Sequence, residues 1–165
     1  MEKESIKESL FEYIKVIIIT VVVTLGILYF IQVSKVVGAS MEPTYHNGNI
    51  ILVDKFFYKR SSPQYNDIVV VKYHVSEGEE QIIKRIVGLP GDHLSIKDNQ
   101  LYRNGELLKE DYINEPMIWE DFECDIPEGK VFIMGDNRNH SIDSRMIGYI
   151  DFDEEIVGRV FFKVF

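Results

Sequence analysis

The sequence predicts a mainly β protein that is attached to a membrane by one N-terminal helix. Two observations support this prediction. An uncharged, apolar stretch of 19 residues, VIIITVVVTLGILYFIQVS, lies between Lys15 and Lys35. After residue 35, segments rich in Val, Ile and aromatic residues alternate with turn residues, and no long stretch shows helical periodicity. We therefore expect a tail over residues 1–14, a transmembrane anchor over residues 15–34 and a β-rich domain over residues 35–165.

The N-terminal stretch has the length of a transmembrane helix. Nineteen helical residues rise about 28 Å, which is close to the thickness of the hydrocarbon core of a bilayer. The β-branched run over residues 17–23 would form a poor helix in water, but in lipid the backbone must satisfy its own hydrogen bonds. A buried core helix is the alternative interpretation. A cleaved signal peptide is less favoured, because FIQVSKVV is a poor match to a small-residue cleavage site.

The charges beside this stretch predict its orientation. Lys3, Lys7 and Lys15 precede it, and Lys35 follows it. The positive-inside rule counts lysine and arginine and largely ignores acidic residues. We therefore expect the tail in the cytoplasm and residues 35–165 on the extracytoplasmic side of the cell membrane.

Composition excludes several classes of function. The chain has 27 acidic and 18 basic residues and a net charge of −9, which argues against nucleic acid as a partner, since phosphate binding needs clustered lysine and arginine. Cys124 is the single cysteine, so the chain has neither an intrachain disulfide framework nor a cysteine-rich zinc site.

Six segments of the β-rich domain have the composition of strands. They are residues 49–54, 67–75, 81–87, 93–96, 130–134 and 155–165. The dipeptide Asn104-Gly105 predicts a two-residue hairpin turn between LYR and ELL. Residues from about 93 to 129 are more polar than their surroundings, so we expect a smaller β insertion there.

Ser40 ends an apolar run in the stretch VVGASMEPT. Serine shortly before proline is ordinary turn chemistry, so this stretch alone leaves two interpretations open. The hydroxyl either forms a turn or is a nucleophile at the edge of a site.

Lys84 occupies an unexpected position in QIIKRIV. If this segment is a strand, Ile82, Lys84 and Ile86 point to the same face. A lysine at the rim of the sheet with its amine in water is one interpretation. The other is an amine held in apolar surroundings, where desolvation lowers its pKa and allows it to act as a general base for a serine.

Other serine chemistries fit the sequence less well. GASME lacks the second glycine of G-x-S-x-G, and the chain has no Ser-x-x-Lys. Four histidines are present, and solvated loop histidine is the preferred interpretation of each; they are His46, His74, His93 and His140. GDNRNHSIDSR has few metal-ligand residues and no repeat spacing, so a metal loop is weakly supported.

Taken together, SMEPT, KRIVGLPGD and GDNRNHSIDSR resemble, in this order, the motifs of type I signal peptidases. The resemblance runs from the anchor to the last segment and is closest to the short, single-anchor form of Gram-positive bacteria. It implies a membrane-anchored serine endopeptidase with a β-rich catalytic domain and a smaller β insertion. The chain departs from the family pattern where Asn66, rather than glycine, precedes Asp67, at a position that serves folding.

The resemblance implies roles for five residues. Ser40 corresponds to the nucleophile and Lys84 to the general base. Ser141 corresponds to a serine that hydrogen-bonds the lysine amine, and Asp143 and Arg145 to a charged pair that braces the site.

It also implies how substrates bind. Val36, Met41, Ile82 and Ile83 fall where the family forms shallow pockets, which suits small residues at positions −1 and −3 of a cleaved signal peptide. The implied partners are preprotein signal peptides, membrane lipid and, in addition, the secretion translocon. No metal and no organic cofactor is implied.

The oxyanion site differs from that of some family members. Two residues before the nucleophile those members have a serine whose hydroxyl stabilises the oxyanion, whereas this chain has Gly38. We expect the backbone N–H of Ser40 to remain as one donor, and Gly38→Ser to keep or raise activity. This expectation assumes that Gly38 has an extended backbone.

Two alternative functions remain open from the sequence. A self-cleaving repressor uses the same Ser/Lys chemistry, but the membrane span and the acidic charge argue against it. A membrane-anchored β domain that only binds or organises partners is the alternative from another class. Incubation with a preprotein separates these possibilities.

Overall fold

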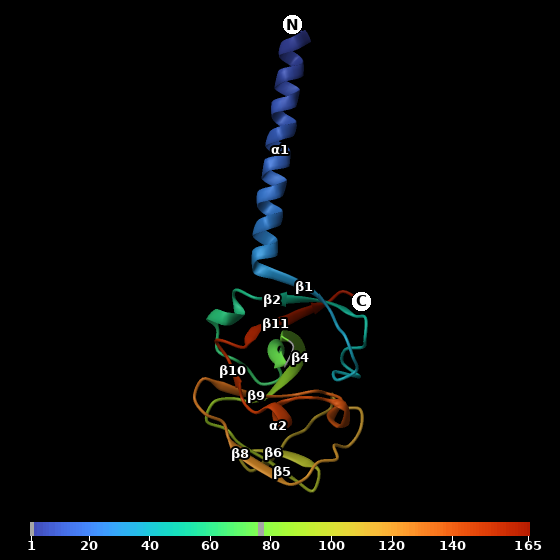
Figure 1. Cartoon of the computed structure of the whole chain (residues 1–165), viewed down its shortest axis with the longest axis vertical. Coiled ribbons are helices and arrows are strands. Elements are labelled where there is room, and N and C mark those ends of the chain that lie inside the picture. The colour runs from blue at the N-terminus through green and yellow to red at the C-terminus, as the bar shows by residue number, and fades with distance from the viewer. Residues whose placement is uncertain (1, 76–77) are drawn as a thin grey trace.

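The computed structural model describes residues 2–75 and 78–165. Helix α1 (Glu2–Phe30) extends away from the β-rich remainder of the chain (Figure 1). Residues Lys7–Phe30 are long and apolar enough to cross a membrane, and none of them is buried against the rest of the protein. The helix ends four residues before the boundary predicted for the anchor, because residues 31–34 belong to the first strand.

The larger sheet has seven strands in the order β1-β2-β11-β3-β4-β9-β10, and every pair in it is antiparallel. Its strands are β1 (Ile31–Lys35), β2 (Ile50–Asp54), β3 (Ile68–Val75), β4 (Gly78–Gly88), β9 (Lys130–Met134), β10 (Ile150–Asp151) and β11 (Ile156–Lys163). The first strand follows α1 directly, so the end of the anchor is joined to one edge of this sheet.

The smaller sheet has four strands in the order β7-β6-β5-β8 and lies at the end of the molecule farthest from the N-terminus (Figure 1). Its strands are β5 (His93–Lys97), β6 (Gln100–Arg103), β7 (Glu106–Leu107) and β8 (Phe122–Asp125). Asn104 and Gly105 join β6 to β7 with φ values of 54° and 82°, as the predicted two-residue hairpin turn requires. The predicted mainly β fold with an N-terminal helix and a smaller β insertion is therefore confirmed.

The six predicted strands are all present, with boundaries that move by a few residues. The sequence missed β1, which lies inside the predicted anchor, and the short strands β8 and β10. Three short helices complete the described structure: η1 (Tyr58–Arg60), η2 (Arg138–His140) and α2 (Ser144–Ile147).

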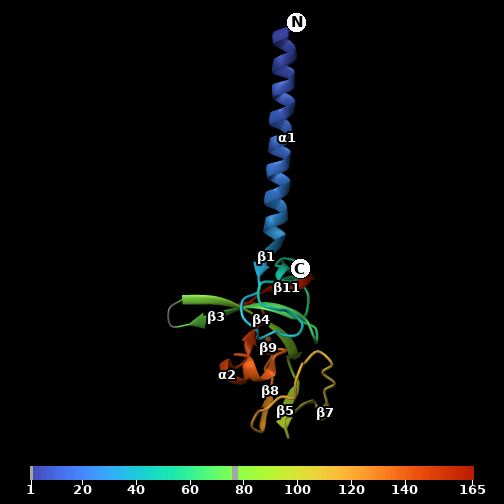
Figure 2. The ribbon, with the colours of Figure 1, turned by 90° about the vertical axis from the view of Figure 1, so that its right-hand side faces the viewer.

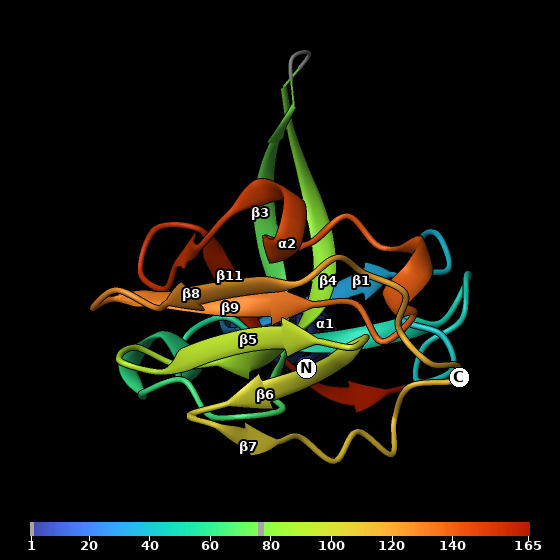
Figure 3. The same ribbon diagram turned by 90° about the horizontal axis from the view of Figure 1, so that it is seen from below.

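Strands β3 and β4 form a long hairpin that projects from the body of the molecule (Figures 2 and 3). Near the body the hairpin is buried on both faces: Val69 and Ile86 belong to one apolar cluster, and Val70 and Ile83 to another. β9 pairs with β4 only from Arg85 onward, so the part of β4 that precedes Arg85 has one edge to which no strand of the described chain pairs. Lys84 is the last residue before this pairing begins.

Candidate active site

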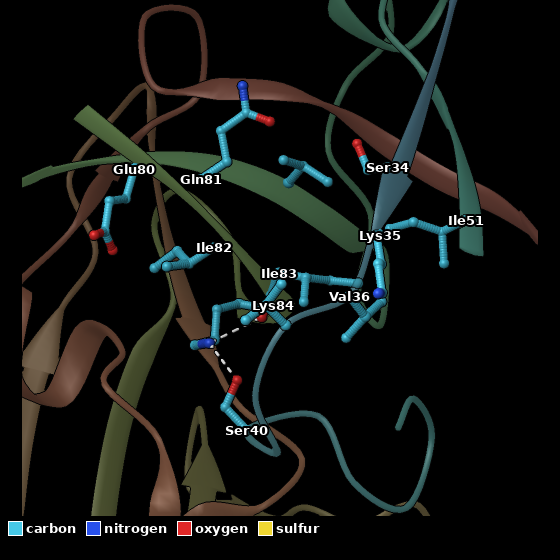
Figure 4. Close-up of a pocket in the computed structure, with 12 residues that line it drawn as sticks. Ser34, Lys35, Val36, Ser40, Ile51, Glu80, Gln81, Ile82, Ile83 and Lys84 are labelled. Carbon is cyan, nitrogen blue, oxygen red and sulfur yellow. Dashed lines mark hydrogen bonds between the residues drawn. The ribbon is translucent and has the colours of Figure 1, made fainter. Parts of the chain in front are cut away.

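Lys84 lies in the middle of β4, opposite Val69 of β3, and its side chain is buried, with 3% of the residue exposed. Its Nζ is 2.8 Å from Ser40 Oγ and 2.9 Å from the carbonyl oxygen of Ile83 (Figure 4). Because Lys84 is held between apolar strands, its amine does not reach bulk water as it would at the rim of a sheet. The structure thus brings together the two side chains that the sequence selected 44 residues apart.

Burial lowers the pKa of Lys84 from 10.5 to about 8. Desolvation is the largest cause, since an ammonium ion loses more than a neutral amine when water is removed. The carboxylates of Asp143 and Asp136 act in the opposite direction and keep the pKa from falling further.

Ser40 lies in the turn region between β1 and β2, where its backbone contacts the loop that follows β9. The carbonyl of Ser40 accepts a hydrogen bond from the backbone N–H of Asn137 at 3.0 Å. The side-chain amide of Asn137 donates to the carbonyl of Ala39 at 3.1 Å. We call residues 135–143 the GDN loop; its backbone holds the backbone of Ser40, while Lys84 contacts the hydroxyl.

Asp143 and Arg145 form a fully buried ion pair at the end of the GDN loop. Arg145 Nε and Nη2 each lie 2.8 Å from one carboxylate oxygen of Asp143. Asp143 also accepts a hydrogen bond from the backbone N–H of Gly135 at 3.0 Å. The pair therefore ties the two ends of the GDN loop together.

A second buried ion pair lies next to Lys84 in the chain. Arg85 Nε and Nη2 are 2.8 and 2.7 Å from the two carboxylate oxygens of Asp136, and Thr44 Oγ1 donates to the same carboxylate. The sequence analysis did not select Arg85 or Asp136. The only signal was their position inside KRIVGLPGD and GDNRNHSIDSR, and nothing in the strand pattern indicated that Arg85 is buried.

Ser141 is placed differently from what the resemblance implies. Its Oγ is buried and has no hydrogen-bond partner among the described residues, so it does not donate to or accept from Lys84. A Cβ added at Gly135 would overlap both Ser141 Oγ and the carbonyl oxygen of Ser40. Only glycine at 135 therefore allows Ser141 and Ser40 to approach this closely.

A cavity of about 340 Å³ extends from Ser40 and Lys84 between β1 and the free part of β4 (Figure 4). Val36, Ile82 and Ile83 line it, as the resemblance implies. Met41 does not: it is 1% exposed and packs in the apolar cluster of Tyr45 and Val70, because the turn after Ser40 directs its side chain into the core. The far part of the cavity is polar and was not anticipated; it is formed by Ser34, Lys35, Glu80 and Gln81.

Gly38 does not have the extended backbone that the expectation for Gly38→Ser assumed. Its φ is +89°, a conformation that favours glycine. Its N–H donates to Asn47 Oδ1 at 3.1 Å, so this N–H is already engaged in a hydrogen bond within the loop. The N–H of Ser40, in contrast, has no hydrogen-bond partner among residues 2–75 and 78–165.

Three of the histidines lie outside this site: His46 pairs with Glu42, His93 with Asp125, and His140 is exposed. The fourth, His74, has a side chain outside the described residues. In the part of the chain that the structure describes, no group of three His, Cys, Asp or Glu side chains could hold a metal ion.

Comparison with known proteins gives a consistent result. The family described as "Signal peptidase, peptidase S26" matches residues 10–165. Signal peptidase I of Bacillus licheniformis is 40% identical over 160 residues, which cover 88% of this chain and 83% of that protein. Signal peptidase I U of Bacillus subtilis (strain 168) is 35% identical over 140 residues, covering 79% and 74%. The crystal structure of a signal peptidase I from Enterococcus faecalis V583 superposes with a TM-score of 0.52 at 31% identity and covers 61% of this chain and 98% of that one.

Proposed function

Because the chain belongs to the signal peptidase I family, peptidase S26, we propose that Ser40 is the nucleophile of this peptidase and Lys84 its general base. The protein is a membrane-anchored serine endopeptidase that cleaves signal peptides from preproteins. Family membership therefore decides against a self-cleaving repressor and against a domain that only binds partners. The roles of individual residues are argued here from the geometry.

The observation that supports the dyad is the 2.8 Å contact between Lys84 Nζ and Ser40 Oγ inside a buried site. With a pKa of about 8, roughly one Lys84 amine in ten is neutral at pH 7, against about one in three thousand at a pKa of 10.5. The neutral amine accepts the hydroxyl proton while Oγ attacks the scissile carbonyl, which forms the tetrahedral intermediate. The resulting ammonium then gives the proton to the leaving amine, and an acyl-enzyme remains.

Hydrolysis of the acyl-enzyme uses the same pair in the same order. Water loses a proton to the neutral Lys84 amine as it attacks the ester carbonyl, and the ammonium returns this proton to Ser40 Oγ as the signal peptide leaves. The oxyanion of the tetrahedral intermediate that forms in both steps needs a hydrogen-bond donor. The N–H of Ser40 is suited to this role because no acceptor among the described residues occupies it.

The cavity beside the dyad suits an extended peptide with small residues before the scissile bond. Val36, Ile82 and Ile83 give it apolar walls next to Ser40. We place the N-terminal tail, residues 1–14, in the cytoplasm and the β-rich domain on the extracytoplasmic side, where the anchor holds the dyad close to membrane lipid. The secretion translocon, which delivers preproteins to that surface, is a further proposed partner.

The test is cleavage of a preprotein by the full-length chain in detergent or vesicles. We expect Ser40→Ala and Lys84→Ala each to lower kcat by at least about 10⁴-fold, and the double variant to be little worse, because the two groups act as a unit. Ser62→Ala and Lys97→Ala, which change the same residue types at exposed positions, are the matched controls and should remain active. A folded Lys84→Ala enzyme with near-normal rate at neutral pH would refute the dyad.

A further inference from the structure

A long irregular segment of the insertion lies against the GDN loop. Residues 108–121, which we call the strap, connect β7 to β8 without a helix or strand of their own. In Figure 3 the chain after β7 passes beside the orange part of the chain before it returns to β8. Irregular connections of this length are uncommon in compact domains and are often functional.

The strongest contact of the strap is a buried ion pair. Arg138 Nη1 and Nη2 lie 2.7 and 2.6 Å from the two carboxylate oxygens of Glu110, with side-chain exposures of 0% and 8%. The Nε of Arg138 donates to the carbonyl oxygen of Gly135 at 3.0 Å. Gly135 is the residue at which an added Cβ would overlap Ser40 and Ser141, so one arginine links the strap to the backbone beside the nucleophile.

An aromatic ring of the strap covers two arginines of the site. The guanidinium carbon of Arg85 lies 3.9 Å from the ring centre of Tyr112, and that of Arg138 lies 5.8 Å away. The hydroxyl of Tyr112 donates to Glu110 at 2.7 Å, which fixes the ring. Since Arg85 holds Asp136, the ring excludes water from the ion pair adjacent to Lys84.

The other end of the strap repeats this arrangement at Arg145. The ring of Trp119 lies 4.3 Å from the guanidinium carbon of Arg145, which pairs with Asp143. Between the two rings, Asn139 of the GDN loop accepts from the N–H of Ile118 at 2.8 Å and donates to the carbonyl of Pro116 at 3.1 Å. The three buried arginines beside the dyad, Arg85, Arg138 and Arg145, are therefore all covered by aromatic rings of the strap.

We propose that the strap is a positioning element for catalysis. Its residues Glu110, Tyr112 and Trp119 fix the position of the GDN loop relative to Ser40 and Lys84. This proposal rests on the assignment of Ser40 and Lys84 as the reacting pair. None of the three strap residues lines the cavity beside Ser40, so their effect is on the alignment of the reacting groups and not on substrate binding.

The experiment measures kcat, KM and the pH dependence of kcat/KM for strap variants of the full-length enzyme. We expect Glu110→Gln to lower kcat about 10- to 100-fold with KM changed less than about twofold, because the misaligned loop affects the chemical step. Tyr112→Leu should lower kcat about tenfold, whereas Tyr112→Phe, which keeps the ring, should stay within about threefold of the unaltered enzyme. Glu120→Gln, exposed in the same strap, and Tyr102→Leu, on β6 of the insertion, are matched controls.

The pH profile separates positioning from a merely structural role. The charged groups that act on Lys84 are Asp143 and Asp136, both on the GDN loop, and both raise its pKa. If the loop moves away, the pKa of Lys84 falls and the midpoint of kcat/KM shifts to lower pH. A structural role would lower the melting temperature but leave kcat per folded enzyme and this midpoint unchanged.

Each outcome decides the proposal. If Glu110→Gln does not fold, the pair Tyr112→Leu and Tyr112→Phe gives the answer, because neither leaves a buried charge unpaired. Folded strap variants with unaltered kcat and midpoint overturn the positioning role, provided that Ser40→Ala and Lys84→Ala are inactive. If those two variants remain active, the assignment of the dyad has failed instead.

Discussion

The two sides of the Ser40–Lys84 pair are built differently. In front of it lies the cavity, whose walls next to Ser40 are the apolar side chains of Val36, Ile82 and Ile83. Behind it lie three buried ion pairs, Arg85–Asp136, Arg138–Glu110 and Arg145–Asp143. The front can accept different peptides because apolar contacts are not directional. The back fixes one geometry because bidentate ion pairs are directional.

The two sides of the site should therefore respond differently to substitution. Shortening an apolar side chain in front removes some contact area and reshapes the cavity. Removing one partner of a buried pair behind leaves an uncompensated charge, at a cost of about 3–5 kcal/mol. We therefore expect variants of the front to change substrate preference, and variants of the back to change stability and rate.

The largest effect expected from this comparison concerns the charge of Lys84, which lies between the cavity and the three buried ion pairs. The pKa of Lys84 is lowered to about 8, and the neutral form is the active one. The value of kcat/KM should therefore rise with pH through a midpoint near 8 and be about 500-fold lower at pH 5 than at pH 8. The measurement is a pH–rate profile on a preprotein. A plateau that continues unchanged to pH 5 would indicate a carboxylate base and would remove the reason for burying Lys84.

The next largest effect is expected behind the dyad. Asp143→Asn preserves the shape of the side chain but leaves Arg145 buried without a counter-charge, so we expect a loss of about 3–5 kcal/mol in the free energy of unfolding. Thermal or urea unfolding in detergent measures it. Asp111→Asn is the matched control, since its partner Lys109 and Asp111 itself are both largely exposed. Equal stability of the two variants would contradict the view that the back is held by its ion pairs.

The sequence predicted the front of the site better than the back. Lys84 could be found because the alternation of a strand places it on one face with two isoleucines. Val36, Ile82 and Ile83 followed from their position beside the motifs. Met41 did not, because the direction of its side chain depends on how the turn after Ser40 packs, and adjacent sequence does not determine that packing.

Two of the three pairs at the back could not be predicted, because Arg85–Asp136 and Arg138–Glu110 are not local; the resemblance had already implied the Asp143–Arg145 pair. Glu110 reaches Arg138 across 28 positions of the chain, from a segment with no periodicity. The sequence indicated a polar insertion, and polarity normally indicates a solvated surface. In the structure the carboxylates of Glu110 and Asp136 are buried because each pairs with an arginine on another segment, and only the folded topology brings the segments together. The start of β1 was assigned to the anchor for a different reason: residues 31–34 carry no charge, so nothing in the sequence separates them from the transmembrane stretch.

A smaller effect is expected in front of the dyad, at Gly38. Its φ of +89° makes any side chain unfavourable, although a Cβ there would meet open space. We now expect Gly38→Ser to lose about 1–2 kcal/mol of stability and not to gain activity, the reverse of the expectation from sequence. Gly38→Ala is the control, because it adds the Cβ without the hydroxyl. If the serine variant is more active than both the alanine variant and the unaltered enzyme, the hydroxyl does stabilise the oxyanion.

The smallest effect is expected behind the dyad at Ser141, where the resemblance and the geometry disagree. The resemblance implies a hydrogen bond from this serine to the lysine, whose loss would cost on the order of 1 kcal/mol and misalign the amine. In the structure the hydroxyl is buried and has no hydrogen-bond partner within residues 2–75 and 78–165, and Lys84 is oriented by Ser40 Oγ and the carbonyl of Ile83. Removing an unsatisfied buried hydroxyl is neutral or stabilising, so Ser141→Ala should keep or raise the melting temperature.

The rate of this variant decides between the two accounts. If Ser141 contributes only by packing beside Gly135, kcat should fall less than about threefold and the pH midpoint should not move. If a rotation of the side chain brings the hydroxyl to Lys84 when substrate binds, kcat should fall by tenfold or more at unchanged KM, as expected for a contact made only in the transition state. We expect the smaller loss, because Lys84 already has two partners in the free enzyme. Ser144→Ala provides the comparison: that hydroxyl accepts the N–H of Ile133 at 2.9 Å, so its removal should lower stability where Ser141→Ala does not.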